Sequence, residues 1–272
     1  MIGKWLTTNL KERFANKELD FDVYFNPYAF KKMSLWDAST YTIKLIAEKY
    51  ENLFVSLSGG YDSEFVLKVC IENKVPVTPI IVITNFNEVE TSLALNFCKV
   101  NNIDPIVVKP TDREIIKLWY EYVYAIQGRG RHSSPILKSL QIAEQNDGWL
   151  LTGDCPPTSD EHIDELDRPM HNSFHLAEWD FYASELFGHP GGLLGYSVEC
   201  MYAFLNELDI NLSTQKAKSK MYGLNFRNKS YMNHSLAMNM VFNALLENPA
   251  AYSVECGTYE SVRDELSKHI VL

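Results

Sequence analysis

Asn52 to Cys70, NLFVSLSGGYDSEFVLKVC, is the stretch of sequence that decides the fold. It starts with a short apolar run of β-forming residues, Leu53 to Leu57. The segment Ser58 to Ser63 (SGGYDS) interrupts this run, and apolar residues then recur at helical spacing from Phe65 to Cys70. This order predicts a strand, a tight loop and a helix.

The paired glycines Gly59 and Gly60 determine what the predicted loop can bind. Glycine readily adopts positive φ and lets a ligand approach the backbone, and the following helix begins with N–H groups that lack intrahelical partners. Such a turn is suited to phosphate. It differs from a Walker A loop, because Asp62 stands where a lysine would be needed, and a divalent cation would therefore have to bridge its carboxylate and the phosphates. An ordinary Gly-Gly turn capped by Asp62 or Ser63 is the alternative.

Composition narrows the class of protein. The 272 residues are 46% hydrophobic and 12% aromatic, which predicts a packed globule. The net charge of -10 argues against broad binding to nucleic acid or anionic membranes. No apolar run approaches the roughly 20 residues that cross a membrane, and the first residues are too charged for a secretory signal. Five scattered cysteines without a CxxC pair indicate a reducing compartment, so we expect a cytoplasmic protein.

Strand-loop-helix units recur after the glycine loop. Val75 to Ile83, Pro105 to Val108 and Gly148 to Leu151 read as further buried strands, each near a helical pattern. This alternation predicts an α/β fold with a doubly wound, mostly parallel, Rossmann-like sheet, whose ligand crevice lies at the carboxyl ends of its strands. Residues 1–34, with a short helix around Trp5 to Phe14, read as an N-terminal extension. The last hundred residues read as mostly helical, with helices expected at 176–186, 197–208, 214–222, 233–247 and 260–269.

Two motifs carry a family resemblance. Ser58 to Ser63 resembles the SGGxDS signature of the PP-loop ATP pyrophosphatases, the adenine nucleotide α-hydrolase-like superfamily. Leu151 to Asp154, followed by Asp160-Glu161, is closest in pattern to the synthetase domain of asparagine synthetase, whose strand ends in SGEG-x-DE; here Cys155 to Ser159 are inserted. The resemblance covers roughly residues 53–161. It implies a HUP-type fold, a nucleotide-binding domain at 35–170 and a helical substrate lobe at 171–272.

The resemblance also assigns roles to individual residues, with ATP and Mg²⁺ as cofactors. Asp62 and Asp154 are expected to act in catalysis and, with Asp160, to hold the metal ion. The expected nucleotide-binding residues are Ser58, Gly59, Gly60, Tyr61, Ser63, Gly153 and the strand edge Thr84, Asn85 and Phe86. For Asp154 and Asp160, an Asx-turn and a solvated acidic run are the alternatives.

Basic residues supply further candidates. Arg129 and Arg131, on a glycine-flanked loop, are suited to bidentate binding of phosphate or carboxylate, and a solvated basic turn is the alternative. One of Lys216, Lys218 and Lys220 could reach the phosphates, as a lysine of this region does in asparagine synthetases; solvated surface lysines are the alternative.

The implied reaction cleaves ATP to AMP and pyrophosphate. A small-molecule substrate is adenylylated on a carboxylate or carbonyl oxygen, and ammonia or an amine then attacks it to form an amide. The chain begins Met-Ile-Gly, so we expect no glutaminase domain and an external nitrogen donor. Oligomeric state is left open, with a homo-oligomer among the options.

Two other functions stay open. Glu255-Cys256-Gly257 resembles the ECG tripeptide of phosphoadenylyl sulfate reductases without its histidine, which would make Cys256 the nucleophile of a thiol-dependent reductase. The other alternative is a nucleotide-binding module without catalytic activity.

Overall fold

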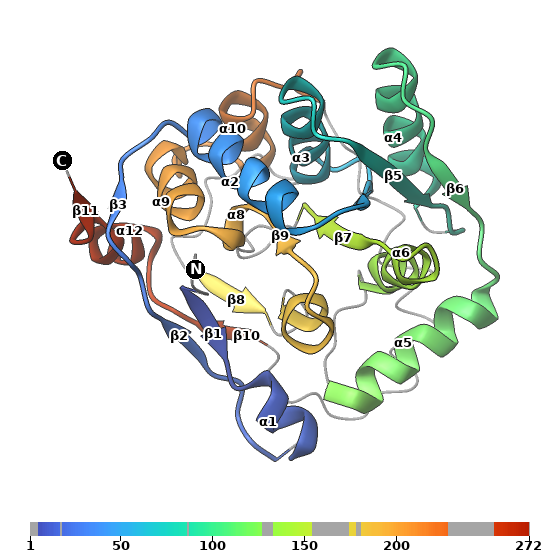
Figure 1. Ribbon diagram of the computed structural model, residues 1–272, viewed down its shortest axis with the longest axis horizontal. Helices are drawn as coiled ribbons and strands as arrows, with labels where there is room; N and C mark the ends of the chain where they lie inside the picture. The colour runs from blue at the N-terminus through green and yellow to red at the C-terminus, as the bar shows by residue number, and fades with distance from the viewer. Residues whose placement is uncertain are drawn as a thin grey trace.

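A five-stranded parallel sheet lies at the centre of the chain (Figure 1). In the computed structural model, the described residues are 5–16, 18–85, 87–126, 133–153, 174–177, 181–227 and 253–271. The strand order is β6-β5-β4-β7-β9. The winding direction therefore reverses between β4 and β7, which is where sheets of this type bind ligands. The strands are β4 (Leu53–Ser56), β5 (Val77–Val82), β6 (Ile106–Val108), β7 (Trp149–Thr152) and β9 (Gly191–Gly192).

Helices cover both faces of this sheet, as predicted for a doubly wound fold. Successive strand residues point to opposite faces, so Ile81 packs towards α3 (Tyr61–Glu72) and α4 (Glu88–Val100). Its neighbours Ile80 and Val82 pack towards α5 (Asp112–Ile126) and α6 (Ser133–Gln145). Strands that are apolar on both faces are typical of buried parallel sheets. The sequence prediction of fold class is confirmed.

The first 34 residues contain more strand than expected. The helix observed here is shorter than the one predicted around Trp5 to Phe14. It is α1 (Leu10–Ala15), and the strand β1 (Leu6–Thr8) precedes it. β1 pairs antiparallel with β2 (Val23–Phe25), and this pairing with a strand further along the chain outweighs local helix propensity. After β3 (Phe30–Lys31), α2 (Leu35–Lys49) starts where Ser34 was predicted to cap it, since the Ser34 side chain accepts a hydrogen bond from the Asp37 amide.

The C-terminal part contains helices and strands. The helices predicted near 197–208, 214–222 and 260–269 appear as α9 (Val198–Glu207), α10 (Thr214–Met221) and α12 (Tyr259–Ser267). The helix predicted at 176–186 is wrong at its start, where β8 (His175–Ala177) pairs with β10 (Ser253–Glu255). In the described residues 181–187 the π-helical turn η2 (Tyr182–Leu186) is present. The glycine break at 188–192 supplies β9 and leads into α8 (Leu193–Tyr196). The helix predicted at 233–247 lies outside the described residues.

One hydrophobic core joins the three ranges proposed as an extension, a nucleotide domain and a helical lobe. It includes Trp5, Phe65 and Phe204, each almost fully buried. The C-terminal strand β11 (Ile270–Val271) pairs in parallel with β3, so both ends of the chain contribute to the same packing.

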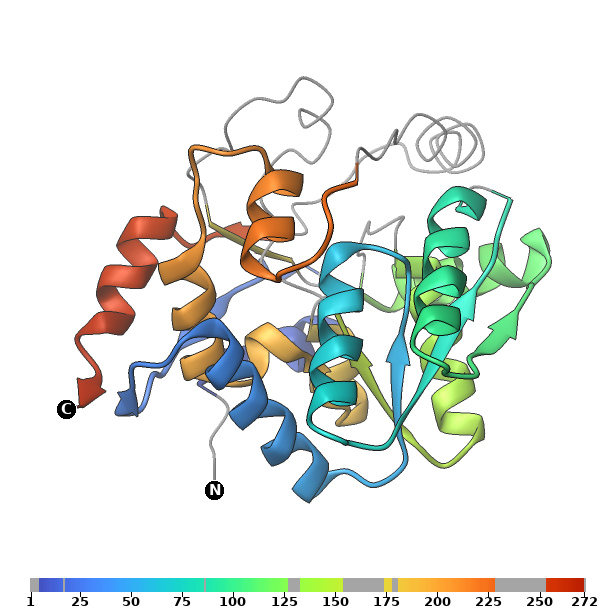
Figure 2. The ribbon, with the colours of Figure 1, turned by 90° about the horizontal axis from the view of Figure 1, so that it is seen from above.

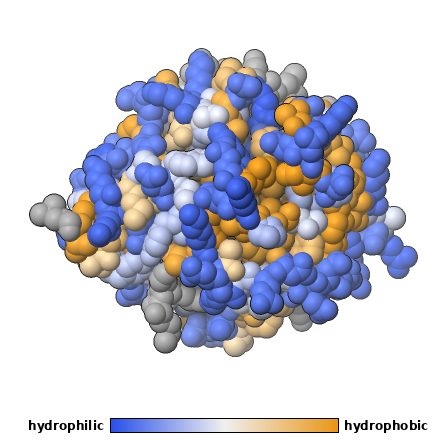
Figure 3. Space-filling view, turned by 45° about the horizontal axis from the view of Figure 1, so that its top comes forward, coloured by the Kyte–Doolittle hydropathy of each residue, from blue (hydrophilic) through white to orange (hydrophobic). Residues whose placement is uncertain are grey.

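Polar and apolar side chains share the face of the molecule drawn in Figure 3. Figure 3 shows one face on which apolar side chains gather in its right half among polar ones. Exposed apolar side chains include Val89 and Val100 of α4, and Phe226. No helix among the described residues is long and apolar enough to cross a bilayer.

Candidate functional site

The glycine loop lies between β4 and α3, at the carboxyl end of the central strand and beside the reversal point of the sheet. Gly59 has φ +84°, and a Cβ added to it would come within 2.0 Å of the Glu90 carbonyl oxygen of α4. Glycine is therefore required here for its conformation and for its lack of a side chain. Gly60 is the N-cap residue of α3, and among the described residues no side chain caps this helix start.

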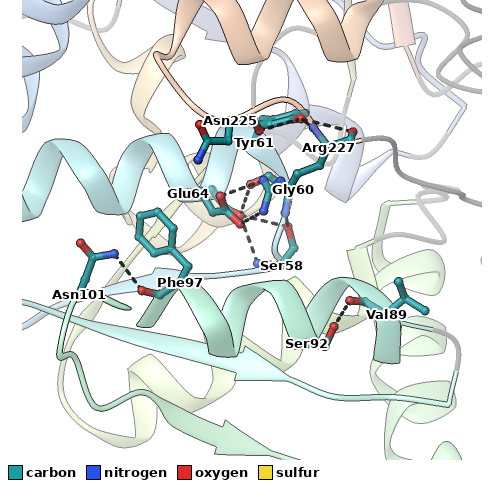
Figure 4. A network of polar contacts seen from close by, with 11 residues as sticks. Ser58, Gly60, Tyr61, Glu64, Val89, Ser92, Phe97, Asn101, Asn225 and Arg227 are labelled. Carbon is teal, nitrogen blue, oxygen red and sulfur yellow. Dashed lines mark hydrogen bonds and ion pairs between the residues drawn. The ribbon is translucent and has the colours of Figure 1, made fainter. Parts of the chain in front are cut away.

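Two serines hold the loop in shape. The Ser58 amide donates to Ser63 Oγ at 3.2 Å, and the Gly60 amide donates to Ser58 Oγ at 3.2 Å. The Ser63 hydroxyl donates to the Gly60 carbonyl at 3.1 Å. Two amides predicted to grip a ligand are thus bonded within the loop (Figure 4). In the first turn of α3, as at any helix start, N–H groups lack intrahelical partners.

The end of β7 packs directly against the start of α3. A Cβ added to Gly153 would lie 2.4 Å from the Ser63 nitrogen and 2.8 Å from the Asp62 carbonyl carbon, so only glycine fits. The preceding residue, Thr152, is 3% exposed, and its hydroxyl has no hydrogen-bond partner among the residues that the structure describes. A buried polar group of this kind costs stability unless a ligand or water satisfies it.

Asp62 is bound by two side chains from the C-terminal part. Lys218 Nζ of α10 donates to its Oδ2 at 2.8 Å, and the Tyr222 hydroxyl donates to its Oδ1 at 2.6 Å. The Lys218 side chain is only 4% exposed, while that of Asp62 is 22% exposed. A buried ammonium is stable only when it is paired, so this contact fixes α10 against α3. Figure 2 shows α10 and the residues after it running beside α3.

A second ion pair joins the same two regions. Arg227 binds Glu64 through two hydrogen bonds, Nη1 to Oε1 at 2.6 Å and Nη2 to Oε2 at 2.9 Å. Its guanidinium lies 4.7 Å from the ring centroid of Tyr61, and its amide donates to the Tyr61 hydroxyl at 2.6 Å. We call Tyr61, Glu64 and Arg227 the Arg227 clamp (Figure 4). Tyr61, predicted to bind nucleotide, is 2% exposed and serves this clamp.

The end of β5 places its predicted residues differently. Thr84 is 6% exposed, and its hydroxyl, like that of Thr152, has no hydrogen-bond partner within the described part of the chain. Asn85 is exposed and donates to Asp112 at 3.3 Å. The buried Asn87 closes the turn, because its Oδ1 accepts from the Thr84 amide and its Nδ2 donates to the Val82 carbonyl. At this strand edge Thr84 is thus buried, whereas Asn85 is exposed.

Several predicted residues fall outside the described part of the chain. They are Phe86, Arg129, Arg131, Asp154 and Asp160. Asp154 follows Gly153 directly in sequence. Its role, like the roles of the two arginines and of Asp160, stays a prediction.

Of the three lysines proposed to reach the phosphates, Lys218 is the one that lies at the loop. Lys220 is exposed and pairs with Asp209 at 3.4 Å. Lys218 shares a helix face with Thr214 and Tyr222, four residues before and after it, and this spacing is the signal that could have selected it. Sequence reasoning missed Tyr222, Thr152 and the Glu64–Arg227 pair.

Cys256 lacks the features of a reactive thiol. Burial raises the pKa of Cys256 to about 11, so the thiol stays protonated near neutral pH. Its Sγ donates to the Val254 carbonyl at 3.6 Å, within the segment that forms β10. The reductase alternative gains no support from this geometry.

Comparisons with known proteins return solved structures only, since no protein-family model and no curated protein sequence matches the chain. An NH3-dependent NAD synthetase from Campylobacter jejuni aligns at 18% identity and a TM-score of 0.33, over 45% of this chain and 57% of its own. An NMN synthetase from Francisella tularensis aligns at 10% and 0.35, over 81% and 99%. An NAD+ synthetase from Burkholderia pseudomallei aligns at 10% and 0.40, over 90% and 85%.

None of these three structures is an asparagine synthetase, so that part of the sequence resemblance stays a prediction. Because the identities and TM-scores are low, we base the functional assignment on the glycine loop and its contacts.

Proposed function

We propose that this chain is an ATP-dependent ligase of the PP-loop type, which cleaves ATP to AMP and pyrophosphate and adenylylates an acceptor oxygen. Ammonia or an amine then displaces AMP and forms an amide. The observation that carries the proposal is the SGGYDS loop, which lies at the carboxyl end of β4 where the sheet reverses, with the buried Lys218 ammonium 2.8 Å from Asp62.

The residues at the loop match the needs of this reaction. The first turn of α3 offers N–H groups to phosphate oxygens. Lys218 brings a positive charge that would stabilise the departing pyrophosphate in a site with little water. Thr84 and Thr152 contribute buried hydroxyls at the ends of β5 and β7 that find no hydrogen-bond partner among the described residues, and a nucleotide bound along this edge would satisfy them.

The donor chemistry fits Mg²⁺ in one respect. Asp62 provides a carboxylate, the kind of oxygen ligand that Mg²⁺ prefers, at the start of α3. Asp154 and Asp160 are the other proposed ligands. When bound, Mg²⁺ would neutralise charge on the phosphates. The described residues contain no cluster of three His, Cys, Asp or Glu side chains.

Exchange of labelled pyrophosphate into ATP tests the proposal. It is measured in the presence of a panel of substrates that carry a carboxylate or carbonyl oxygen. We expect substrate-dependent exchange that Asp62→Asn lowers about 100-fold or more, since a charged group beside the reacting phosphates is removed. Asparagine keeps the shape of the side chain and an acceptor for Tyr222. Lys220→Met, on the exposed side of the same helix, is the matched control and should retain exchange.

Binding of nucleotide without exchange for any substrate would instead favour the non-catalytic module. Full exchange in Asp62→Asn would contradict the role given to the loop.

A further inference from the structure

Arg227 contacts the first turn of α3 through both its side chain and its backbone. The guanidinium binds the Glu64 carboxylate through two hydrogen bonds, at 2.6 and 2.9 Å, and lies 4.7 Å from the centroid of the Tyr61 ring. The Arg227 amide donates to the Tyr61 hydroxyl at 2.6 Å. That hydroxyl donates towards the Asn225 and Arg227 carbonyls at 3.4 Å each. Several contacts of different kinds therefore converge on this one turn.

The turn that Arg227 holds contains Asp62 and follows the glycine loop directly. Tyr61 is the first residue of α3 and Glu64 lies three positions later on the same face, so Asp62 stands between the two residues of the clamp. Gly60 has no side chain to cap this helix start, and helix ends without constraint fray. Arg227 thus supplies, from a distant segment, a constraint that a capping side chain would supply locally.

The segment that carries Arg227 is also docked on α3 by contacts other than the clamp. Lys68 Nζ donates to the Tyr222 and Gly223 carbonyls at 3.3 and 3.2 Å. The Tyr222 ring stacks on Phe65, with centroids 4.3 Å apart. These contacts lie further along α3 than the clamp. A buried ion pair is weak evidence for stability, whereas a bidentate arginine fixes both position and orientation, so the clamp fits alignment of the first turn better than docking.

We propose that Arg227 is a positioning residue for the ligase reaction, because it holds the first turn of α3, and with it Asp62, in the geometry that the reacting phosphates require. This inference rests on the proposed function. A misplacement of about 1 Å can lower a reaction rate about 100-fold. A bound nucleotide can shift together with the turn, so its affinity depends less on this alignment. Loss of the clamp therefore lowers kcat more than it weakens nucleotide binding.

Arg227→Lys tests this role, because lysine keeps the positive charge and the backbone contacts but lacks the planar fork that binds both Glu64 oxygens. In the pyrophosphate exchange assay, its kcat should fall about tenfold or more. Calorimetry with the non-cleavable analogue α,β-methylene-ATP should give a Kd within about threefold of wild type. A second variant, Tyr61→Phe, keeps the ring and loses only the hydroxyl bonds to the segment, and its kcat should fall about threefold or more.

Lys68→Met is the matched control, since it removes a cation that joins the same helix and segment beyond the first turn. Its kcat should stay within about twofold of wild type. Wild-type kcat in Arg227→Lys, or in Tyr61→Phe if the lysine variant does not fold, overturns the positioning role. An equal loss of kcat in Lys68→Met overturns it too. A wild type that exchanges pyrophosphate with no substrate overturns the proposed function and this inference together, which distinguishes the two levels of failure.

Discussion

Among the described helices, two pairs that bury polar side chains use different chemistry. Between α2 and α9 the partners are small and neutral, with the Thr42 and Ser197 hydroxyls 2.7 Å apart and fully buried. Between α3 and the region of α10 the partners carry full charges, Asp62 with Lys218 and Glu64 with Arg227. Paired hydroxyls are inexpensive to bury, whereas ions lose much of their hydration energy. A contact that accepts this cost next to a glycine loop indicates a functional role, and the α2–α9 contact indicates a structural one.

The largest expected effect comes from removing the carboxylate at the loop. Asp62→Ala leaves the Lys218 ammonium buried without this partner, and we expect a loss of about 3 kcal/mol in the free energy of unfolding. Urea denaturation measures it. The double variant with Lys218→Met should recover much of the loss, because the buried ammonium is removed together with the carboxylate. If Asp62→Ala alone lowered the free energy of unfolding by less than an ordinary surface substitution does, the two helix pairs would not differ in the way described.

The second charged pair should rank next. Arg227→Ala is expected to lower the free energy of unfolding by about 2 kcal/mol. The Glu64 side chain, 3% exposed in the wild type, loses both hydrogen bonds to Arg227, and the space left by the arginine gives it only some access to water. Thermal denaturation and urea titration both report it. Arg263→Ala breaks an exposed pair with the adjacent Asp264 and should change stability by less than about 0.5 kcal/mol. Equal effects at both arginines would contradict the importance of burial.

His189 allows pH to convert a buried neutral group into a charged one. Its Nδ1 accepts from the Leu150 amide at 2.9 Å, and burial lowers its pKa, opposed by Glu144 at 3.7 Å. Because the folded-state pKa lies below the unfolded value of about 6.5, the unfolded chain takes up protons first as the pH falls, and stability is lost below that value by at most about 1.4 kcal/mol per pH unit.

The free energies of unfolding of wild type and His189→Asn, compared between about pH 7.5 and pH 5, measure this contribution. This range lies on both sides of the pKa of histidine in the unfolded chain. Asparagine preserves an acceptor for Leu150 and does not titrate. The difference in unfolding free energy between the two proteins should therefore shrink as the pH falls. A difference that is independent of pH would rule out His189 as its source.

The smallest effect is expected at the neutral contact. Thr42→Val removes one hydroxyl while keeping a side chain of similar volume, and it should lower the free energy of unfolding by about 1 kcal/mol. It should leave binding of α,β-methylene-ATP unchanged, which calorimetry checks. A large loss of nucleotide binding would mean that the α2–α9 contact also serves the site.

Local patterns account for what the sequence predicted well. The alternation of apolar strands with helical spacing led to the doubly wound sheet, and the glycine pair led to the loop at the end of β4. Short strands without a periodic pattern were missed, as with β9, which consists of Gly191 and Gly192. Side-chain periodicity cannot signal a strand made only of glycine.

The partners of the loop were harder to predict because they lie far away in sequence. Lys218 is separated from Asp62 by 156 positions, and Arg227 from Glu64 by 163. In the segment QKAKSKMY the three lysines look alike, and only the packing of α10 distinguishes the buried one. The hydrogen bonds that the Ser58 and Gly60 amides make within the loop were also not predicted, because serine hydroxyls can fold back onto the backbone without a local sequence signal.

The long separation between α3 and its counter-ions has a consequence for biosynthesis. A ribosome releases the first turn of α3, with Asp62 and Glu64, well before it has made Lys218 and Arg227. Until those residues emerge, both carboxylates are hydrated and α3 has no fixed neighbour on that side. A nascent chain that stalls before residue 218 can therefore form much of the sheet and still lack a competent loop, so the site matures only after α10 has been made.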